Sequence, residues 1–267
     1  MKKEELRRKA IQKTRESIKK ELIRRDRLIV HVVKTMDQID KTANLLLEQL
    51  KEWYAIYFPE LARSVEEPEE YLKLLINLKT KDQFTEKNIV ELVGEKRYRK
   101  DLEYASKNSM GIELGEEDLA KIVSYAEKIQ ALRTERQKLE GYLEKLMGEE
   151  APNIMAVVGA AIGARLIATA GSLEKLAEFP SSTIQVLGAE KALFSHLRKH
   201  TLSPKHGIIF AYPKLRGAPL KVRGKIARRI ASKLSIAAKV DFFKGKFVGD
   251  KLAKELEEQI ARVVKTK

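Results

Sequence analysis

Apolar residues recur along the first part of the chain at alternating intervals of four and three. No proline interrupts this pattern before Pro59. The pattern therefore predicts one helix of about 50 residues, roughly 75 Å long at 1.5 Å per residue. Heptad spacing of this kind is typical of a helix that packs along a partner helix. Its positions are Ile11, Arg15, Ile18, Leu22, Arg25, Ile29, Val32, Met36, Ile39, Ala43, Leu46, Leu50, Trp53 and Tyr57.

A second stretch with the same spacing supplies the partner. We expect its helix to begin near Glu116. Because a long rod cannot be covered by its own turns, the two helices are predicted to pack antiparallel as a coiled-coil hairpin. The positions of the second stretch are Tyr125, Ile129, Leu132, Arg136, Leu139, Leu143 and Leu146.

Shorter helices are predicted between the two rods, over residues 69–78, 89–93 and 96–106, after Pro59 and Pro68 end the first rod. Residues 107–115, with two glycines, indicate the turn into the returning helix. The apolar side chains of this tip have two interpretations, dimerisation tip to tip or capping of the rod. They are Leu74, Leu75 and Ile76.

The pattern changes after residues 148–152, where Gly148 and Pro152 mark the end of one helix and the start of the next. Small residues such as Gly159 and Gly163 indicate closely packed helices. Ser172 is predicted to cap the helix of residues 173–178, and Ser181 or Ser182 to begin the next one. The chain is therefore predicted to be all-α, with a coiled-coil domain at 1–148, a compact helical domain at 149–251 and a basic tail at 252–267.

Positive charge is concentrated in two parts of the chain, whose net charge is +15. Residues 1–29 hold 12 basic and 5 acidic side chains, and residues 30–187 hold 21 basic and 27 acidic ones. Residues 188–251 hold 16 basic and only 3 acidic side chains. A solvated helix face accounts for the first stretch, but the imbalance in the last one predicts contact with nucleic acid.

The basic block contains one long predicted helix, between Pro219 and Asp241. Its apolar residues share one face, which leaves the cations to meet phosphates. Arginine can bind a phosphate in a bidentate manner, whereas lysine acts as a point charge. The cations are Arg223, Lys225, Arg228, Arg229, Lys233 and Lys239.

The residue pattern offers no catalytic centre, cofactor site or metal site. His196 and His200 share a helical face, but the residues between them include Arg198 and Lys199, which oppose a bound cation. Ser195 next to His196 cannot form a nucleophile–base pair, because adjacent helical residues point in different directions. The chain has no cysteine, and its longest apolar run, residues 154–166, is interrupted by glycines, so we expect no membrane segment.

Several long motifs in fixed order carry a resemblance to a known family. They are LGAEKALFSHLRKH at residues 187–200, PKHGIIF at 204–210 and RGKIARRIASKLSIAAKVDFF at 223–243, with a lead-in at 153–188. This sequence is similar to the Nop domain, and the preceding hairpin resembles the coiled-coil region of the same family. The short basic end resembles the archaeal branch.

The resemblance implies an RNA-binding scaffold of a box C/D guide ribonucleoprotein, not an enzyme. Implied partners are the guide RNA, a small ribosomal-protein-like protein that binds the kink-turn, and a second copy of the chain through the coiled coil. The scaffold would support 2′-O-methylation of RNA by fibrillarin inside an archaeal cell, or in the nucleolus of a eukaryote. A splicing-factor-like member or a general nucleic-acid-binding coiled-coil protein is the alternative.

The resemblance also suggests which residues contact RNA. The GAEK segment (Gly188, Ala189, Glu190, Lys191) resembles the family's RNA contact near the guide duplex, although a simple tight helix start is the other interpretation. Arg198, Lys199, Lys205 and His206 correspond to positions near the kink-turn and its protein. Arg216 completes the expected set with the cations of the long helix.

Three aromatic positions carry separate expectations. We expect Phe194 and Phe210 to belong to the core instead of stacking on RNA. Relatives tend to carry a polar residue or a histidine for stacking at Ala211 and Tyr212, so this chain departs from the pattern, and Tyr212 is a candidate substitute.

One further departure concerns fibrillarin. The fibrillarin-binding domain that precedes the coiled coil in the family is not found here, so we expect a truncated form that recruits fibrillarin only if that domain is supplied.

Overall fold

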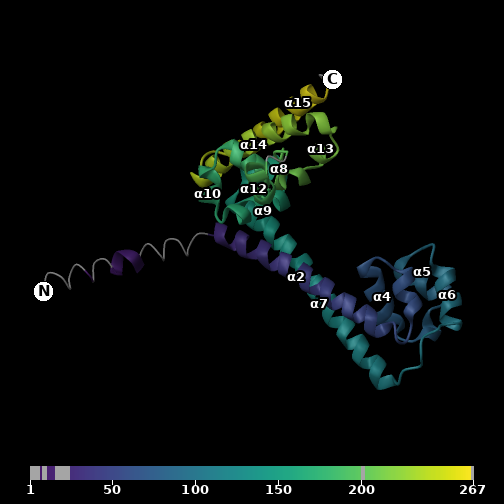
Figure 1. Cartoon of the computed structure of the whole chain (residues 1–267). Helices are drawn as coiled ribbons and strands as arrows, with labels where there is room; N and C mark the ends of the chain where they lie inside the picture. The colour runs from purple at the N-terminus through teal and green to yellow at the C-terminus, as the bar shows by residue number, and fades with distance from the viewer. Residues whose placement is uncertain (1–6, 8–10, 16–24, 200–201, 266–267) are drawn as a thin grey trace. The chain divides into compact units, whose positions relative to one another are not determined.

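The computed structural model describes residues 7, 11–15, 25–199 and 202–265, and this part of the chain is helical without a strand (Figure 1). The all-α prediction is confirmed. No helix in these residues is both long and apolar enough to cross a membrane. The predicted extension of the first rod back to Ile11 falls partly on residues 16–24, which lie outside the described residues. The first long helix, α2, runs over Asp26–Tyr54.

The chain divides into two compact units, which we treat separately. Unit 1 comprises Met1–Thr35 and Leu139–Lys267, and unit 2 comprises Met36–Lys138. Helix α2 and the second long helix, α7 (Glu116–Glu150), contribute residues to both units. The predicted start of α7 near Glu116 is confirmed.

Unit 2 holds an aromatic core built by short helices. Prolines at the first turns start α3 and α4, and the Thr85 side chain caps α5 by accepting a hydrogen bond from the Asn88 amide. Tyr54, Phe58, Tyr71 and Phe84 are fully buried there. The helices are α3 (Pro59–Ser64), α4 (Pro68–Leu78), η1 (Lys81–Gln83), α5 (Glu86–Val93) and α6 (Arg99–Lys107).

Leu74 and Leu75 are also fully buried in this core, and Ile76 packs against it. Leu74 and Leu75 are therefore not available for a tip-to-tip contact. They close the end of the unit, which was the alternative, because α4 turns this face toward α5 and α2.

Helices α2 and α7 pair antiparallel in unit 2, as predicted. Arg133 donates a hydrogen bond to Asn44 at 2.9 Å, and Arg136 forms an ion pair with Asp40 at 3.2 Å. Leu47 and Tyr54 are buried more deeply than the predicted heptad positions Leu46 and Trp53, although Trp53 still contacts Tyr125 of α7, with ring centroids 6.2 Å apart. The short helices of unit 2 pack against the side of α2 that carries Leu47 and Tyr54, so the buried face of α2 is shifted by one residue from the heptad positions. A regular coiled coil remains a prediction.

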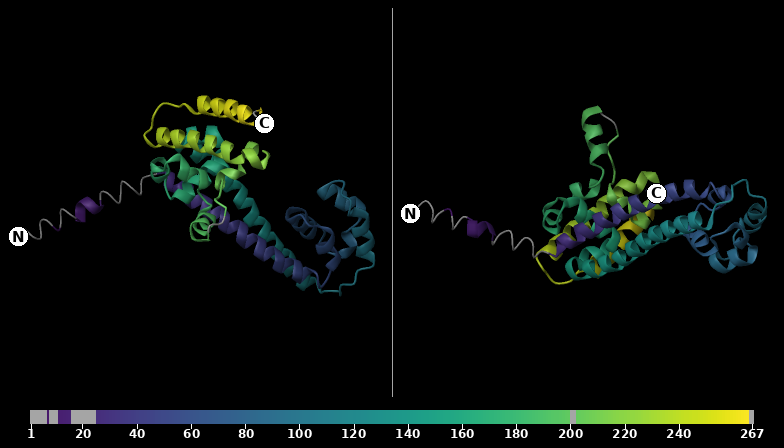
Figure 2. Two further views of the ribbon diagram at one scale, coloured as in Figure 1. Left: turned by 45° about the horizontal axis from the view of Figure 1, so that its top comes forward. Right: turned by 90° about the horizontal axis from the view of Figure 1, so that it is seen from below.

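Unit 1 is organised around one central helix, α14 (Leu220–Phe242), which packs against α8, α10, α11 and α15 (Figure 2). Ten of its residues are buried on the face toward these helices. The predicted helix between Pro219 and Asp241 is confirmed. The other elements are α8 (Pro152–Val158), α9 (Ala160–Ala170), α10 (Leu173–Glu178), α11 (Ser181–Val186), α12 (Glu190–Lys199), η2 (Ile208–Ala211), α13 (Pro213–Arg216) and α15 (Gly249–Lys265).

Helix α15 includes most of the predicted basic tail. Leu252, Leu256 and Ile260 are buried on its inner face, spaced four residues apart. This stripe packs α15 against α14 and α8 within unit 1.

Two glycines of unit 1 have different structural roles. Gly159 separates α8 from α9 at a φ of 83°, a left-handed conformation that side chains disfavour. Gly163 is a close-packing position, since a Cβ there would lie 2.7 Å from Ile154 Cγ2 and 2.8 Å from Met147 Cε. The close approach predicted from small residues is confirmed at Gly163.

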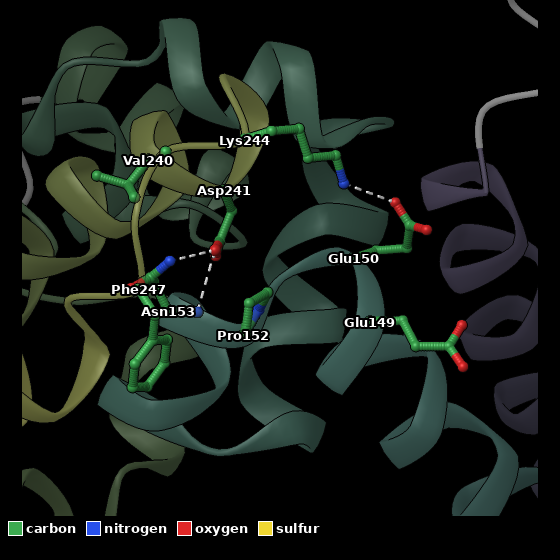
Figure 3. Close-up of a pocket in the computed structure, with 9 residues that line it drawn as sticks. Glu149, Glu150, Pro152, Asn153, Val240, Asp241, Lys244 and Phe247 are labelled. Carbon is green, nitrogen blue, oxygen red and sulfur yellow. Dashed lines mark hydrogen bonds and ion pairs between the residues drawn. The ribbon is translucent and has the colours of Figure 1, made fainter.

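A buried carboxylate ties the ends of α14, α8 and α15 together (Figure 3). Asp241 accepts hydrogen bonds from the Asn153 amide at 3.0 Å, from Asn153 Nδ2 at 2.6 Å and from the Ile154 amide at 2.9 Å. Asn153 Oδ1 in turn accepts a hydrogen bond from the Val248 amide at 2.7 Å. The carboxylate therefore satisfies the free amides at the start of α8, where no helical partner exists. Burial raises the pKa of Asp241 despite these hydrogen bonds.

Candidate nucleic-acid interface

A helical arm leaves the body of unit 1 at Gly188 and returns at His206. Its base, which we call the neck, is closed by two backbone hydrogen bonds, from Gly207 to Gln185 O at 2.9 Å and from Ile208 to Leu187 O at 2.8 Å. A Cβ on Gly207 would lie 1.9 Å from Leu187 O, and one on Gly188 would lie 2.6 Å from Ile208 Cγ1. Gly188 also has a φ of 85°. The neck therefore requires glycine at both positions.

The GAEK segment follows the neck directly. Helix α12 begins at Glu190, two residues after Gly188. The Glu190 carboxylate folds back and accepts a hydrogen bond from the Gly188 amide at 2.6 Å. The Gly188 amide is therefore already occupied, and Lys191 is the cation that this segment exposes.

Helix α12 has no buried residue, and one of its faces is cationic. Lys191, Arg198 and Lys199 surround a shallow concavity of about 440 Å³ together with Phe194 and Ser195. Phe194 is 60% exposed, so its predicted place in the core is wrong. The reason is that the arm projects α12 beyond the neck, where no element of the described part of the chain covers this ring.

A second cationic concavity lies between residues 202–205 and the first half of α14. This basic groove, of about 530 Å³, is lined by Lys205, Lys221, Lys225 and Arg228. Gln185 fixes one wall by donating a hydrogen bond to Lys205 O at 2.7 Å. Within residues 25–199 and 202–265, none of the four cations has an ion-pair partner, so their charge faces solvent.

Lys221 was not among the predicted site residues. The signal was present, since Lys221 lies four residues before Lys225 and so shares its helical face. The prediction began with Arg223, which points elsewhere.

Arg223 belongs to a stack of side chains at the edge of α14. The His206 and Phe210 rings are parallel within 12°, with centroids 4.4 Å apart, and the Arg223 guanidinium lies 5.3 Å from the Phe210 centroid. Arg223 also donates hydrogen bonds to Ala218 O at 2.8 Å and Arg216 O at 3.2 Å. These contacts give Arg223 a positioning role beside the groove.

His206 is affected by this position. Burial, followed by the nearby charges of Arg223 and Lys205, lowers the pKa of His206. The imidazole is therefore biased toward its neutral form. Phe210 is partly buried in this stack, and Tyr212 is partly buried as well.

The remaining predicted cations fall into two groups. Arg216, Arg229 and Lys239 are exposed. Lys233 is only 8% exposed and forms an ion pair with Glu255 of α15, so the structure removes it from the predicted surface. Its helical position faces α15, and the burial there requires a counter-charge.

These features define a class of protein, a helical protein whose cationic concavities suit a polyanion. The chain belongs to the Nop family: the profile described as "snoRNA binding domain, fibrillarin" matches residues 35–262. The resemblance to this family is confirmed.

Individual relatives agree with this assignment. The chain is 47% identical over 250 residues to an uncharacterized NOP5 family protein of Methanocaldococcus jannaschii, an alignment that covers 94% of this chain and 60% of that one. It is 36% identical over 254 residues to human nucleolar protein 56, covering 93% of this chain and 43% of that one. The chain thus spans about 60% or less of the length of these relatives.

A solved structure is also similar. The crystal structure of a fibrillarin/Nop5p complex contains a chain that matches with a TM-score of 0.55 and 29% identity. The match covers 97% of this chain and 77% of that one.

Proposed function

We propose that this protein is an RNA-binding scaffold of a box C/D guide ribonucleoprotein and acts without catalysing a reaction itself. The observation that carries the proposal is the basic groove, in which four solvent-facing cations line one concavity. Phosphates are the natural ligands of such a groove, because each neutralised phosphate releases counterions. The family match at residues 35–262 and the nucleolar relatives support RNA as the polyanion.

The RNA that we propose is a kink-turn, bound jointly with a small ribosomal-protein-like protein. In unit 1 the basic groove offers cations for phosphates, and the exposed face of α12 offers both cations and the Phe194 ring. Such a mixed surface fits a folded RNA held against a second protein better than a uniform duplex. Methyl transfer in the assembly is assigned to fibrillarin, which is named in the similar complex.

Homodimerisation is proposed for unit 2. The Ile112 amide donates a hydrogen bond to Ile56 O at 3.0 Å, and Met110 and Ile112 lie on one short segment. Glu60 holds this segment by accepting hydrogen bonds from Ser109 and the Met110 amide. Met110 is 87% exposed, and Ile56 and Ile112 are also exposed. A fixed loop that presents apolar side chains is typical of an interface.

The RNA proposal is tested by gel shift with a kink-turn RNA, with and without the kink-turn-binding protein. Lys225→Glu combined with Arg228→Glu is expected to weaken ternary binding about 100-fold, because it replaces two phosphate-facing cations by anions. The matched control reverses the same charge at exposed sites outside the groove, with Lys145→Glu and Lys254→Glu, and is expected to change binding less than about threefold.

Three outcomes would contradict the proposal. Ternary affinity unchanged in the groove variant would remove the groove from the interface. Equal affinity for any duplex would indicate a general nucleic-acid-binding protein. Methyl transfer by this chain alone, with guide RNA and a methyl donor, would indicate an enzyme.

A further inference from the structure

The exposed face of α14 continues beyond the basic groove to the end of the helix. From Lys225, positions three or four residues apart lead through Arg229, Ser232, Ile236 and Lys239 to Phe243, and all six are exposed. At 1.5 Å per residue this stripe extends about 27 Å. Its far end is aromatic, whereas its near end is cationic.

The stripe ends in a loop of sequence FKGKF, residues 243–247, which is held in one shape. Lys244 adopts a φ of 52°, and the Gly245 amide donates a hydrogen bond to Val240 O at 2.9 Å. Lys244 also forms an ion pair with Glu150 at 3.0 Å, next to the Asn153–Asp241 hydrogen bonds (Figure 3). The Phe247 ring lies where a side chain on Gly249 would be, 2.7 Å from its Cβ position.

This fixed loop turns two aromatic rings toward solvent. Phe243 is 75% exposed and Phe247 is 54% exposed. Lys239 and Lys246 are exposed beside them. Two rings flanked by lysines match a platform on which successive bases stack while the cations attract the backbone.

We propose that the FKGKF loop stacks unpaired nucleotides that flank the folded RNA in the basic groove. This inference rests on the proposed function, because the RNA whose unpaired end reaches the loop is the RNA proposed to bind in the basic groove. A stacked strand advances about 3.4 Å per nucleotide, so a 27 Å stripe corresponds to about eight nucleotides. Two rings and one isoleucine are too few for a stable protein interface, which buries about 800 Å² on each partner.

The test compares two kink-turn RNAs in the presence of the kink-turn-binding protein. One RNA is blunt, and the other carries an unpaired extension of about eight nucleotides, placed at each end in turn. For the unaltered protein we expect the extension at one end to tighten binding roughly tenfold, from stacking on the two rings. The variant with Phe243→Ala and Phe247→Ala should bind the blunt RNA with unchanged affinity, and the extension should no longer tighten its binding.

Two controls separate this inference from the proposed function. Tyr104→Ala removes an exposed ring from unit 2 and should keep the full gain. Lys225→Glu combined with Arg228→Glu should weaken the binding of both RNAs by the same factor. If the unaltered protein does not bind the blunt RNA, the proposed function is contradicted. If it binds the blunt RNA but the extension does not tighten binding, only the proposal for the FKGKF loop is contradicted.

A second readout does not depend on affinity. With 5-bromouridine in the extension, irradiation is expected to crosslink the RNA to the peptide that contains residues 243–247, as identified by mass spectrometry. The proposal is overturned if the double variant keeps the gain, if the crosslinks fall elsewhere, or if the loop binds anionic vesicles in place of the extension. Thermal melting of the double variant confirms that it is folded.

Discussion

The two units use the same charged residue types in opposite ways. In unit 2, several lysines and arginines are paired with carboxylates, as in Lys81–Glu113 and Arg99–Glu86. In unit 1, the cations of the basic groove face solvent without such partners. Charge count alone does not indicate binding. What distinguishes a polyanion site is a set of cations that the fold gathers and leaves uncompensated.

The apolar surfaces differ in the same manner. Unit 2 buries Tyr54, Phe58, Tyr71 and Phe84 but exposes Met110 and Ile112 on a fixed loop. Unit 1 exposes aromatic rings beside cations instead, at Phe194 and Phe243. We therefore propose that unit 1 binds RNA and that unit 2 mediates self-association. The following changes test this proposal.

The largest effect is expected from Asp241→Ala in unit 1. The substitution leaves the Asn153 and Ile154 amides buried without an acceptor, which should lower the free energy of unfolding by about 3 kcal/mol. RNA binding should be lost with the fold, while Trp53 fluorescence, the only tryptophan signal, should still report a folded unit 2. Urea denaturation followed by circular dichroism and fluorescence measures both. Asp250→Ala, at an exposed site, is the control, and equal destabilisation by both would contradict the role of Asp241.

A smaller effect is expected from Met110→Asp combined with Ile112→Asp in unit 2. Placing two carboxylates on the exposed loop should weaken self-association at least tenfold, because the like charges would meet in a symmetric interface. Sedimentation velocity over a range of concentrations measures the shift. RNA binding per chain should be retained. A dimer of unchanged strength would place the interface elsewhere.

The smallest effect is expected on the stability of unit 2 at acidic pH. Hydrogen bonds from Met110 and Ser109 lower the pKa of Glu60 although partial burial opposes them, and Lys96 lowers the pKa of Glu70. Each carboxylate therefore stabilises unit 2 above its unfolded pKa, and this stabilisation is lost as the pH falls through the folded pKa. Asp241 has a raised pKa, so its contribution has the opposite sign and is lost as the pH rises.

Trp53 fluorescence should accordingly show the urea midpoint of unit 2 decreasing between about pH 5 and pH 3. Glu60→Gln should flatten this decrease, because the amide cannot ionise. A pH profile identical to that of the unaltered protein would show that Glu60 does not contribute.

The sequence predicted much of the fold because the residues that start and end its helices act locally. Pro59 and Pro68 were predicted to end the first rod and Pro152 to start a helix, and Ser172 caps α10 by accepting a hydrogen bond from the Lys175 amide at 3.2 Å. Heptad spacing found α2 and α7 as antiparallel partners. The register near Tyr54 was missed, because it depends on which side of α2 the short helices cover.

The site was predicted less completely. The cationic helix was identified as a whole, but its periodicity does not reveal which cation meets a carboxylate from a distant helix, as Lys233 meets Glu255. Nor did it reveal that the Glu190 side chain occupies the Gly188 amide, or that Phe194 lies beyond the neck.

The sequence by itself determined the helical class, the punctuation of the helices, the family and the concentration of positive charge, since each depends on neighbours within a few turns. Only the tertiary structure decided which cations face solvent, which carboxylate is buried and which rings are exposed. These outcomes depend on contacts between residues far apart in the chain, such as Asn153 with Asp241, and desolvation by those contacts sets whether a charge is neutralised or left to bind.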